Sequence, residues 1–165
     1  MSRLHWIATN EAGRLAIAAR PRSGDWLEDE ICGWKAEGVD LVVSLLGPDE
    51  VHQLGLQQEA ELCRTHGVAF ISFPIVDRGV PDSRREVALL ARSLATGVSE
   101  GRALVIHCRA GIGRSSVIAA CTMICGGVSG ADAFSSIEAA RGVRVPDTEE
   151  QREWVMAFAD DKIGP

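Results

Sequence analysis

The sequence contains no tyrosine, and only two of its 17 basic residues are lysines. It has no Cys-x-x-Cys pair and no His/Cys cluster with the spacing of a zinc site, which argues against a structural metal ion. No segment approaches the roughly 18 consecutive apolar residues that a membrane-spanning helix requires. Residues 1–10 lack the apolar stretch of a secretory signal peptide. We therefore expect a cytoplasmic protein with no membrane span and no metal site.

The size and charge of the chain narrow the possibilities further. A chain of 165 residues is predicted to form one domain, over residues 1–165, whose core is large enough to need no disulfide bonds. The odd count of five cysteines agrees with that, and Cys121 and Cys125 are expected to pack in the core. The net charge of −6 disfavours nonspecific binding to nucleic acid or to an anionic membrane.

Strand-like and helix-like patterns alternate along the chain. Strands are predicted at residues 4–8, 14–19, 39–46, 68–73 and 102–107. Helices are predicted at residues 26–36, 56–66, 83–99, 114–125, 130–140 and 147–160, with a short one opening at 48–50. Asp25 is expected to cap the first helix, and Trp26 and Trp34 to pack in the core. The alternation predicts a single-domain α/β fold with a mostly parallel central sheet flanked by helices, and a site at the carboxyl ends of its strands.

The most informative segment is residues 107–116, which reads His-Cys-Arg-Ala-Gly-Ile-Gly-Arg-Ser-Ser. A strand-like run leads into it and a helix-like run leads out of it. Gly111 and Gly113 allow the backbone to curl and turn its N–H groups inward, and such a nest of amides binds anions. The N-terminus of the following helix adds unpaired N–H donors. The segment therefore predicts a loop that holds a tetrahedral oxyanion.

Three side chains in this segment have the chemistry that phosphoryl transfer needs. Arg114 carries a planar guanidinium that can bind two phosphate oxygens at once. The same positive surroundings favour the thiolate form of Cys108, which then faces the bound phosphate as a nucleophile. Ser115 can donate a hydrogen bond to that sulfur and assist its later departure. The alternative is a buried cysteine that precedes an ordinary strand-to-helix turn.

These residues resemble the signature loop of the cysteine-dependent phosphatase superfamily, and the chain as a whole is similar to the small dual-specificity protein phosphatases. The resemblance rests on the Cys-x5-Arg spacing, the preceding histidine, the two glycines and the following serine. It implies a protein-tyrosine-phosphatase-like fold in which His107 orients Cys108, and in which no metal or other cofactor takes part. The phosphate would be bound by the loop residues Arg109, Ala110, Gly111, Ile112, Gly113 and Arg114.

A second segment, residues 73–82, supplies a candidate general acid. It follows a predicted strand and contains proline and glycine residues that suit a mobile loop. The leaving oxygen of a phosphate ester needs a proton, which a carboxylic acid can provide. The segment resembles the general-acid loop of the dual-specificity phosphatases, with Asp77 at the position of the acid. Asp82 is the alternative, although its place before a helical run also suits a helix cap.

Gln151 is a softer candidate. In many tyrosine phosphatases a glutamine in this region positions the water that hydrolyses the phosphocysteine, and Gln151 resembles it by position. The other interpretation is a residue in the first turns of a helix that Asp147 or Thr148 caps. Arg109, in the signature loop, and Arg78, beside the acid, are either residues that shape substrate preference or ordinary surface arginines.

The resemblance implies a hydrolase that removes phosphate from phosphotyrosine, and also from phosphoserine or phosphothreonine if the pocket is shallow, through a phosphocysteine intermediate. The expected partner is a phosphorylated protein or peptide, and the expected state is a monomer. A phosphoinositide phosphatase is one alternative, but such enzymes tend to carry lysines inside the loop, and this loop has none. A non-catalytic phosphate-binding module is another, but such modules typically lack the cysteine, the arginine or the acid. An RNA 5′-triphosphatase should be more basic, and the loop arginine with the upstream acid loop argues against a rhodanese-type sulfurtransferase.

Overall fold

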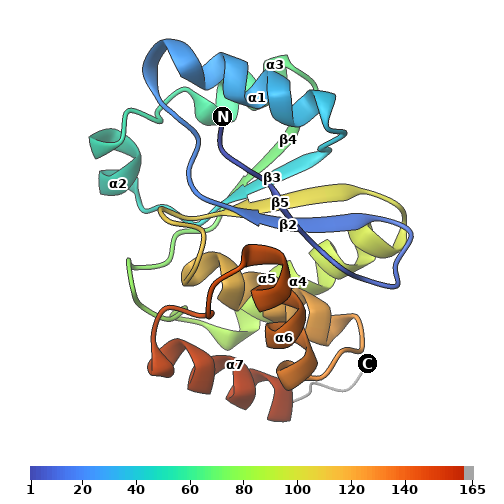
Figure 1. The fold of residues 1–165 in the computed structure, drawn as a ribbon. Coiled ribbons are helices and arrows are strands. Elements are labelled where there is room, and N and C mark those ends of the chain that lie inside the picture. Colours follow the sequence, from blue (N-terminus) through green and yellow to red (C-terminus); the bar gives the residue numbers. More distant parts are fainter. Residues whose placement is uncertain (162–165) are drawn as a thin grey trace.

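The computed structural model describes residues 1–161 and has the predicted α/β architecture. Five strands form one sheet in the order β1-β2-β5-β3-β4 (Figure 1). Only the pair of β1 and β2 is antiparallel, so the sheet is mostly parallel, as the sequence predicts. The strands are β1 (His5–Ile7), β2 (Arg14–Ala18), β3 (Leu41–Ser44), β4 (Ala69–Ser72) and β5 (Ala103–His107).

Helices cover both faces of this sheet (Figure 1). One face carries α1 (Leu27–Ala36) and α3 (Glu59–Thr65). The other face carries α4 (Arg84–Ser99), α5 (Arg114–Cys125), α6 (Gly130–Arg141) and α7 (Glu149–Asp160). Two shorter elements complete the chain, a 3₁₀ turn η1 (Gly24–Trp26) before α1 and the helix α2 (Pro48–Gln53) after β3.

The two central strands are covered on both sides, which explains their apolar sequences. Every residue of β3 and of β5 is buried. Along β5, Leu104 and Ile106 join the apolar cluster beneath α4 and α5, whereas Val105 joins the cluster beneath α1. Because successive strand residues point to opposite faces, a strand packed on both sides is apolar at most positions, and here only Ser44 and His107 are polar.

Side-chain caps mark several helix starts. The Ser83 hydroxyl accepts a hydrogen bond from the Glu86 amide at the start of α4, and Ser129 does the same for Asp132 at the start of α6. Asp25 caps no helix, contrary to the prediction, because the chain enters α1 through the 3₁₀ turn and the N-cap position falls on Trp26. The other helices begin within three residues of their predicted starts.

Two predictions about the core are wrong. Trp34 is fully buried as expected, but Trp26 is 56 % exposed and lies under the Arg22 guanidinium, 4.7 Å from the ring centroid. Its place in the 3₁₀ turn removes it from the buried face of α1. Cys121 is buried, whereas Cys125, the last residue of α5, is exposed.

Among residues 1–161, no helix is both long enough and apolar enough to cross a lipid bilayer. The cytoplasmic location stays a prediction.

Candidate active site

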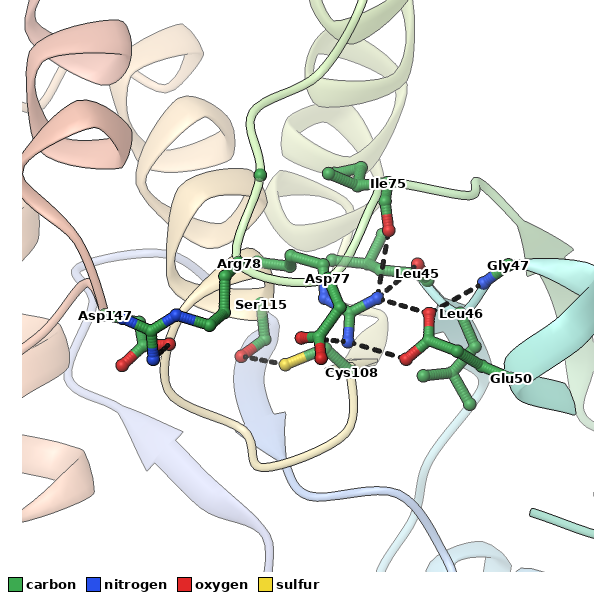
Figure 2. Close-up of polar contacts among 12 residues, drawn as sticks. Leu45, Leu46, Gly47, Glu50, Ile75, Asp77, Arg78, Cys108, Ser115 and Asp147 are labelled. Carbon is green, nitrogen blue, oxygen red and sulfur yellow. Dashed lines mark hydrogen bonds and ion pairs between the residues drawn. The ribbon is translucent and has the colours of Figure 1, made fainter. Parts of the chain in front are cut away.

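The loop between β5 and α5 places Cys108 at the carboxyl end of the sheet. Cys108 follows the last residue of β5 and is 3 % exposed. Its Sγ lies 3.4 Å from the Oγ of Ser115, which belongs to the first turn of α5 (Figure 2). The thiol and the hydroxyl that the sequence pairs are therefore in contact. We call residues 108–114 the phosphate loop.

The curvature of the phosphate loop depends on Gly111. Its φ is +71°, and a Cβ atom there would lie 2.5 Å from the carbonyl carbon of Ala18 on β2. On the outer side of the loop, Arg141 of α6 donates to the carbonyl oxygens of Gly111 at 3.0 Å and Ala110 at 3.3 Å. The N–H and C=O of one peptide unit point in opposite directions. The contacts from Arg141 therefore turn the N–H groups of Gly111 and Ile112, which share peptide units with these two carbonyls, away from Arg141. No local sequence pattern points to Arg141.

Arg114 is held by a carboxylate that sequence reasoning missed. Its Nη1 and Nη2 donate to the two carboxylate oxygens of Glu50, on α2, at 2.7 and 3.0 Å. The Nη1 group also donates to the backbone oxygen of Ile75 at 2.9 Å. Figure 2 shows Glu50 and Ile75 approaching the phosphate loop from two different segments. The Arg114 side chain is 2 % exposed, so these contacts set its orientation.

This ion pair keeps both partners charged. Burial opposes ionisation of Glu50, but hydrogen bonds from Arg114 and from the Gly47 amide outweigh burial and hold the pKa of Glu50 below its usual value. Burial also disfavours the charged form of Arg114, yet the hydrogen bond to Glu50 and the charge on Cys108 outweigh it and raise the pKa of Arg114. The guanidinium therefore remains a cation beside Cys108.

Asp77 also reaches Arg114. Its Oδ1 accepts a hydrogen bond from Nη2 at 3.0 Å, and its side chain is 52 % exposed (Figure 2). Asp82 lies elsewhere, in a separate hollow formed by residues 72–74 and the start of α4. Ser83, and not Asp82, caps α4. Of the two candidate acids, only Asp77 lies in the same cavity as Cys108.

That cavity has a volume of about 210 Å³ and gathers segments that are far apart in the sequence. The acid loop (residues 73–82) contributes Asp77 and Arg78. The remaining lining comes from the phosphate loop and from the start of α7: Cys108, Arg109, Ala110, Ile112, Gly113, Arg114, Asp147 and Gln151. A thiol, a guanidinium and a carboxylate thus share a small opening, which is the set of groups that attack on a phosphate ester requires.

Backbone groups bind both ends of the Gln151 side-chain amide. Its Oε1 accepts from the amides of Asp147 and Thr148, at 3.0 and 3.1 Å, and its Nε2 donates to the carbonyl oxygen of Gly79 at 3.0 Å. Thr148 in turn accepts from the Gln151 amide, which completes a capping box for α7. These contacts favour the helix-start interpretation of Gln151, and they add a tie between α7 and the acid loop.

A second tie joins the same two segments. Arg78, whose φ is +58°, pairs with Asp147 at 3.1 Å (Figure 2). Together with the Gln151–Gly79 hydrogen bond, this pair holds the acid loop over the cavity. Sequence reasoning places Arg78 beside the acid but does not identify Asp147 as its partner.

Behind Cys108 lies a buried pair. His107 places Nδ1 3.2 Å from the carbonyl oxygen of Cys108 and Nε2 2.6 Å from Oε1 of Glu59, on α3. The side chains of His107 and Glu59 are 0 % and 2 % exposed. Glu59, like Glu50 and Arg141, has no local pattern that would have revealed it.

Comparison with known proteins agrees with this geometry. The family described as "Swiss Army Knife protein, DSP-PTPase phosphatase domain" matches residues 1–153. Cyclin-dependent kinase inhibitor 3 of Rattus norvegicus is 27 % identical over 128 residues, which is 76 % of this chain and 60 % of that protein. The chain therefore spans less than two thirds of this curated relative's length.

Solved structures show the same fold. Kinase-associated phosphatase, with its catalytic-site cysteine replaced by serine, has a TM-score of 0.87 at 22 % identity, over 96 % of this chain and 94 % of that one. Tk-PTP in its active form has a TM-score of 0.73 at 29 % identity, over 92 % of this chain and 94 % of that one. The predicted protein-tyrosine-phosphatase-like fold is confirmed.

Proposed function

We propose, from the premise that this chain belongs to the DSP-PTPase family of phosphatase domains, that it hydrolyses phosphate esters on proteins through a phosphocysteine. One observation carries the proposal: Cys108 and Arg114 of the phosphate loop and Asp77 of the acid loop line one cavity at the carboxyl ends of parallel strands. Each has a distinct role in the reaction, as nucleophile, oxyanion ligand and proton donor.

Substrate binding begins with an exchange of partners at Arg114. Without substrate, the Asp77 carboxylate accepts from Nη2 of Arg114. An incoming phosphate oxygen takes that place, while Glu50 keeps its hold on the guanidinium. The phosphate-loop amides bind the remaining equatorial oxygens. Asp77, released from Arg114 and protonated, then turns to the ester oxygen.

The first chemical step transfers the phosphoryl group to sulfur. The Cys108 thiolate attacks phosphorus in line, and the S–P bond forms as the bond to the ester oxygen breaks. Asp77 gives its proton to that oxygen, so the leaving group departs as a neutral alcohol or phenol. Arg114 and the loop amides stabilise the negative charge that spreads over the equatorial oxygens.

The second step restores the enzyme. A water molecule attacks phosphorus, Asp77 takes up its proton, and the S–P bond breaks to release phosphate and the thiolate. Ser115 stabilises the departing sulfur through the contact between its Oγ and Cys108 Sγ. Gln151 contributes by holding the acid loop through Gly79, which keeps Asp77 above the cavity.

The substrate class that fits best is phosphotyrosine, with phosphoserine and phosphothreonine as further substrates. Aryl phosphates have a better leaving group than the alkyl phosphates of serine and threonine. The cavity is small and is lined by only three short segments. The names of the relatives, Cyclin-dependent kinase inhibitor 3 and kinase-associated phosphatase, support a phosphorylated protein as the partner. The absence of lysine within the phosphate loop argues against a phosphoinositide headgroup.

Phosphate release from a matched panel tests the proposal. The panel holds one peptide sequence phosphorylated on tyrosine, serine or threonine, together with a phosphoinositide. We expect phosphotyrosine to react fastest and Cys108→Ser to release no phosphate. The matched control is Cys32→Ser, which removes an exposed thiol on α1 and leaves the rates unchanged.

Each other result points to a different activity. Comparable rates on all three peptides would indicate full dual specificity. Turnover of the lipid alone would support the phosphoinositide alternative and overturn the protein substrate. Binding of phosphopeptide without phosphate release, in reducing buffer, would identify a phosphate-binding module.

A further inference from the structure

The acid loop carries an arginine in a strained backbone conformation. Of the non-glycine residues that the structure describes, only Arg78 has a positive φ, +58°. It lies in the middle of a turn that the Gly79 amide closes by donating to the Val76 carbonyl oxygen at 2.8 Å. Glycine adopts this conformation without steric cost, whereas arginine does not. An arginine at this position therefore needs contacts that compensate the strain.

The Arg78 side chain makes such a contact with Asp147, just before α7. Its Nη1 donates to Oδ2 of Asp147 at 3.1 Å. Figure 2 shows the Arg78 side chain extending toward Asp147, whereas Asp77, the preceding residue, extends toward Arg114. The turn thus directs two neighbouring side chains to different parts of the cavity. Because they share one turn, the contact that fixes Arg78 also fixes the direction of Asp77.

Asp147 is itself held against the phosphate loop. Its amide donates to Oε1 of Gln151 at 3.0 Å, within the start of α7. A Cβ atom at Gly113 would lie 2.8 Å from Cβ of Asp147 and 3.0 Å from Oε1 of Gln151, so the start of α7 packs directly on the phosphate loop. The Arg78–Asp147 pair therefore ties the acid loop to a segment in contact with the loop that carries Cys108.

We propose that Arg78 is a positioning residue whose ion pair with Asp147 keeps the Asp77 carboxyl at the leaving oxygen, and that this pair determines how well the protein hydrolyses esters of weakly acidic alcohols. An ester of an acidic phenol expels its oxygen with little help from a proton donor. Phosphoserine and phosphothreonine release alcohols that are far weaker acids, so their hydrolysis depends on the proton from Asp77. The inference rests on the proposed function, because it concerns the proton donor of that reaction.

The exposure of the pair limits the size of the effect. The side chains of Arg78 and Asp147 are 65 % and 35 % exposed, so water and salt screen their attraction. An exposed ion pair changes an equilibrium constant by a factor of up to about five. The hydrogen bond from Gln151 to Gly79 remains when the pair is removed, so the acid loop is loosened and not released. We therefore expect a severalfold loss of proton donation.

Two small substrates, 4-nitrophenyl phosphate and phenyl phosphate, test the proposal, because they differ in the acidity of the leaving phenol and carry no peptide that could contact Arg78. Arg78→Asn removes the cation, and asparagine tolerates a positive φ. We expect its kcat/KM to fall about three- to fivefold for phenyl phosphate and less than about twofold for 4-nitrophenyl phosphate. Equal losses on the two substrates, or no loss on phenyl phosphate, would overturn the proposal.

Arg85→Asn is the matched control. Arg85 is an exposed arginine at the start of α4, so neither value of kcat/KM should change. Thermal unfolding followed by circular dichroism establishes that all variants are folded.

Asp147→Asn separates a positioning role from direct binding of substrate by Arg78. It preserves the shape of the side chain and removes the charge that holds Arg78. If Arg78 acts through the pair, Asp147→Asn should show the same selective loss on phenyl phosphate, and the double variant should lose no more than either single variant. If Arg78 binds substrate directly, Asp147→Asn frees the guanidinium and should raise kcat/KM for both substrates. That rise, an unchanged kcat/KM or additive losses would contradict the proposal.

Hydrogen exchange measures the tie without turnover. By NMR, the protection factor of the Gly79 amide should fall about two- to fivefold in Arg78→Asn and in Asp147→Asn, and stay unchanged in Arg85→Asn. A protection factor equal to that of the wild type in both variants overturns the inference. If the wild type releases phosphate but neither exchange nor substrate preference moves, this inference fails alone. If exchange accelerates but the wild type releases no phosphate from either substrate, the proposed function fails while the tie between Arg78 and Asp147 stands.

Discussion

Replacing Glu50 with glutamine tests how firmly Arg114 is held. The Glu50 carboxylate accepts two charge-assisted hydrogen bonds from Arg114, at 2.7 and 3.0 Å, and its side chain is 15 % exposed. Glutamine keeps one acceptor but turns an NH₂ group toward the guanidinium. One such bond is therefore lost, and hydrogen bonds to charged groups contribute about 1.5–3 kcal/mol each. We expect Glu50→Gln to lower the free energy of unfolding by about 2 kcal/mol at neutral pH.

This loss should depend on pH in a defined direction. The pKa of Glu50 in the folded protein lies below its ordinary value of 4.5. The carboxylate therefore stabilises the fold fully above that ordinary value, and the stabilisation disappears as the pH falls through the lower, folded pKa. Glu50→Gln has no carboxylate to protonate. The stability difference between wild type and variant should thus be constant near neutrality and narrow below about pH 4.5.

Urea unfolding followed by circular dichroism, at about pH 7 and about pH 3.5, measures both quantities. Asp49→Asn is the matched control, since Asp49 is an exposed carboxylate on the same helix α2. The activity of Glu50→Gln, measured well below its melting temperature, should fall about tenfold in kcat/KM because Arg114 is less well oriented. If Glu50→Gln is as stable as Asp49→Asn at neutral pH, or if the difference does not narrow in acid, the assigned role of the ion pair is wrong.

Two further substitutions, each paired with a control substitution, test the site. Asp77→Asn should lower kcat on a phosphotyrosine peptide by about 100-fold or more, because the leaving oxygen loses its proton donor. Asp82→Asn should leave kcat unchanged, and the opposite ranking in steady-state kinetics would identify Asp82 as the acid. Gly111→Ala should abolish activity and lower the melting temperature, because its Cβ would meet the Ala18 backbone at 2.5 Å in addition to the strain of a positive φ. Gly127 also has a positive φ, +100°, but a Cβ there would meet open space, so Gly127→Ala should lower the melting temperature only through backbone strain. An equal fall in melting temperature for both variants would contradict a close approach of Gly111 to the Ala18 backbone.

The secondary structure was predictable where its causes are local. The apolar residues 41–43 of β3 and 103–106 of β5 predict strands covered on both faces, and the structure has them. Ser83 and Thr148 cap α4 and α7 through bonds to residues three positions later, which a short sequence window contains. The sequence-based predictions failed where a neighbouring element changes the surroundings that a local apolar pattern implies. Trp26 fits the apolar stripe of α1 but belongs to the 3₁₀ turn before it.

The candidate site divides in the same way. The phosphate loop, from Cys108 through Arg114, is one continuous segment, and its residue types alone indicate a thiol nucleophile and an anion-binding loop. Asp77 required a second segment, and its proximity to Arg114 became clear only in the folded chain. The choice between Asp77 and Asp82 depends on which of them faces the cavity, and loop composition does not decide that.

The sequence by itself determined the α/β class, the order of the elements and the segments that carry thiol, guanidinium and acid, because each of these is encoded by residues close together in the chain. Only the tertiary structure decided which carboxylates hold those groups in place. Glu50 lies 64 positions from Arg114, and Glu59 lies 48 positions from His107. Parallel strands bring their carboxyl ends to one edge of the sheet, so side chains far apart in sequence meet there, and no local pattern records which of them will pair.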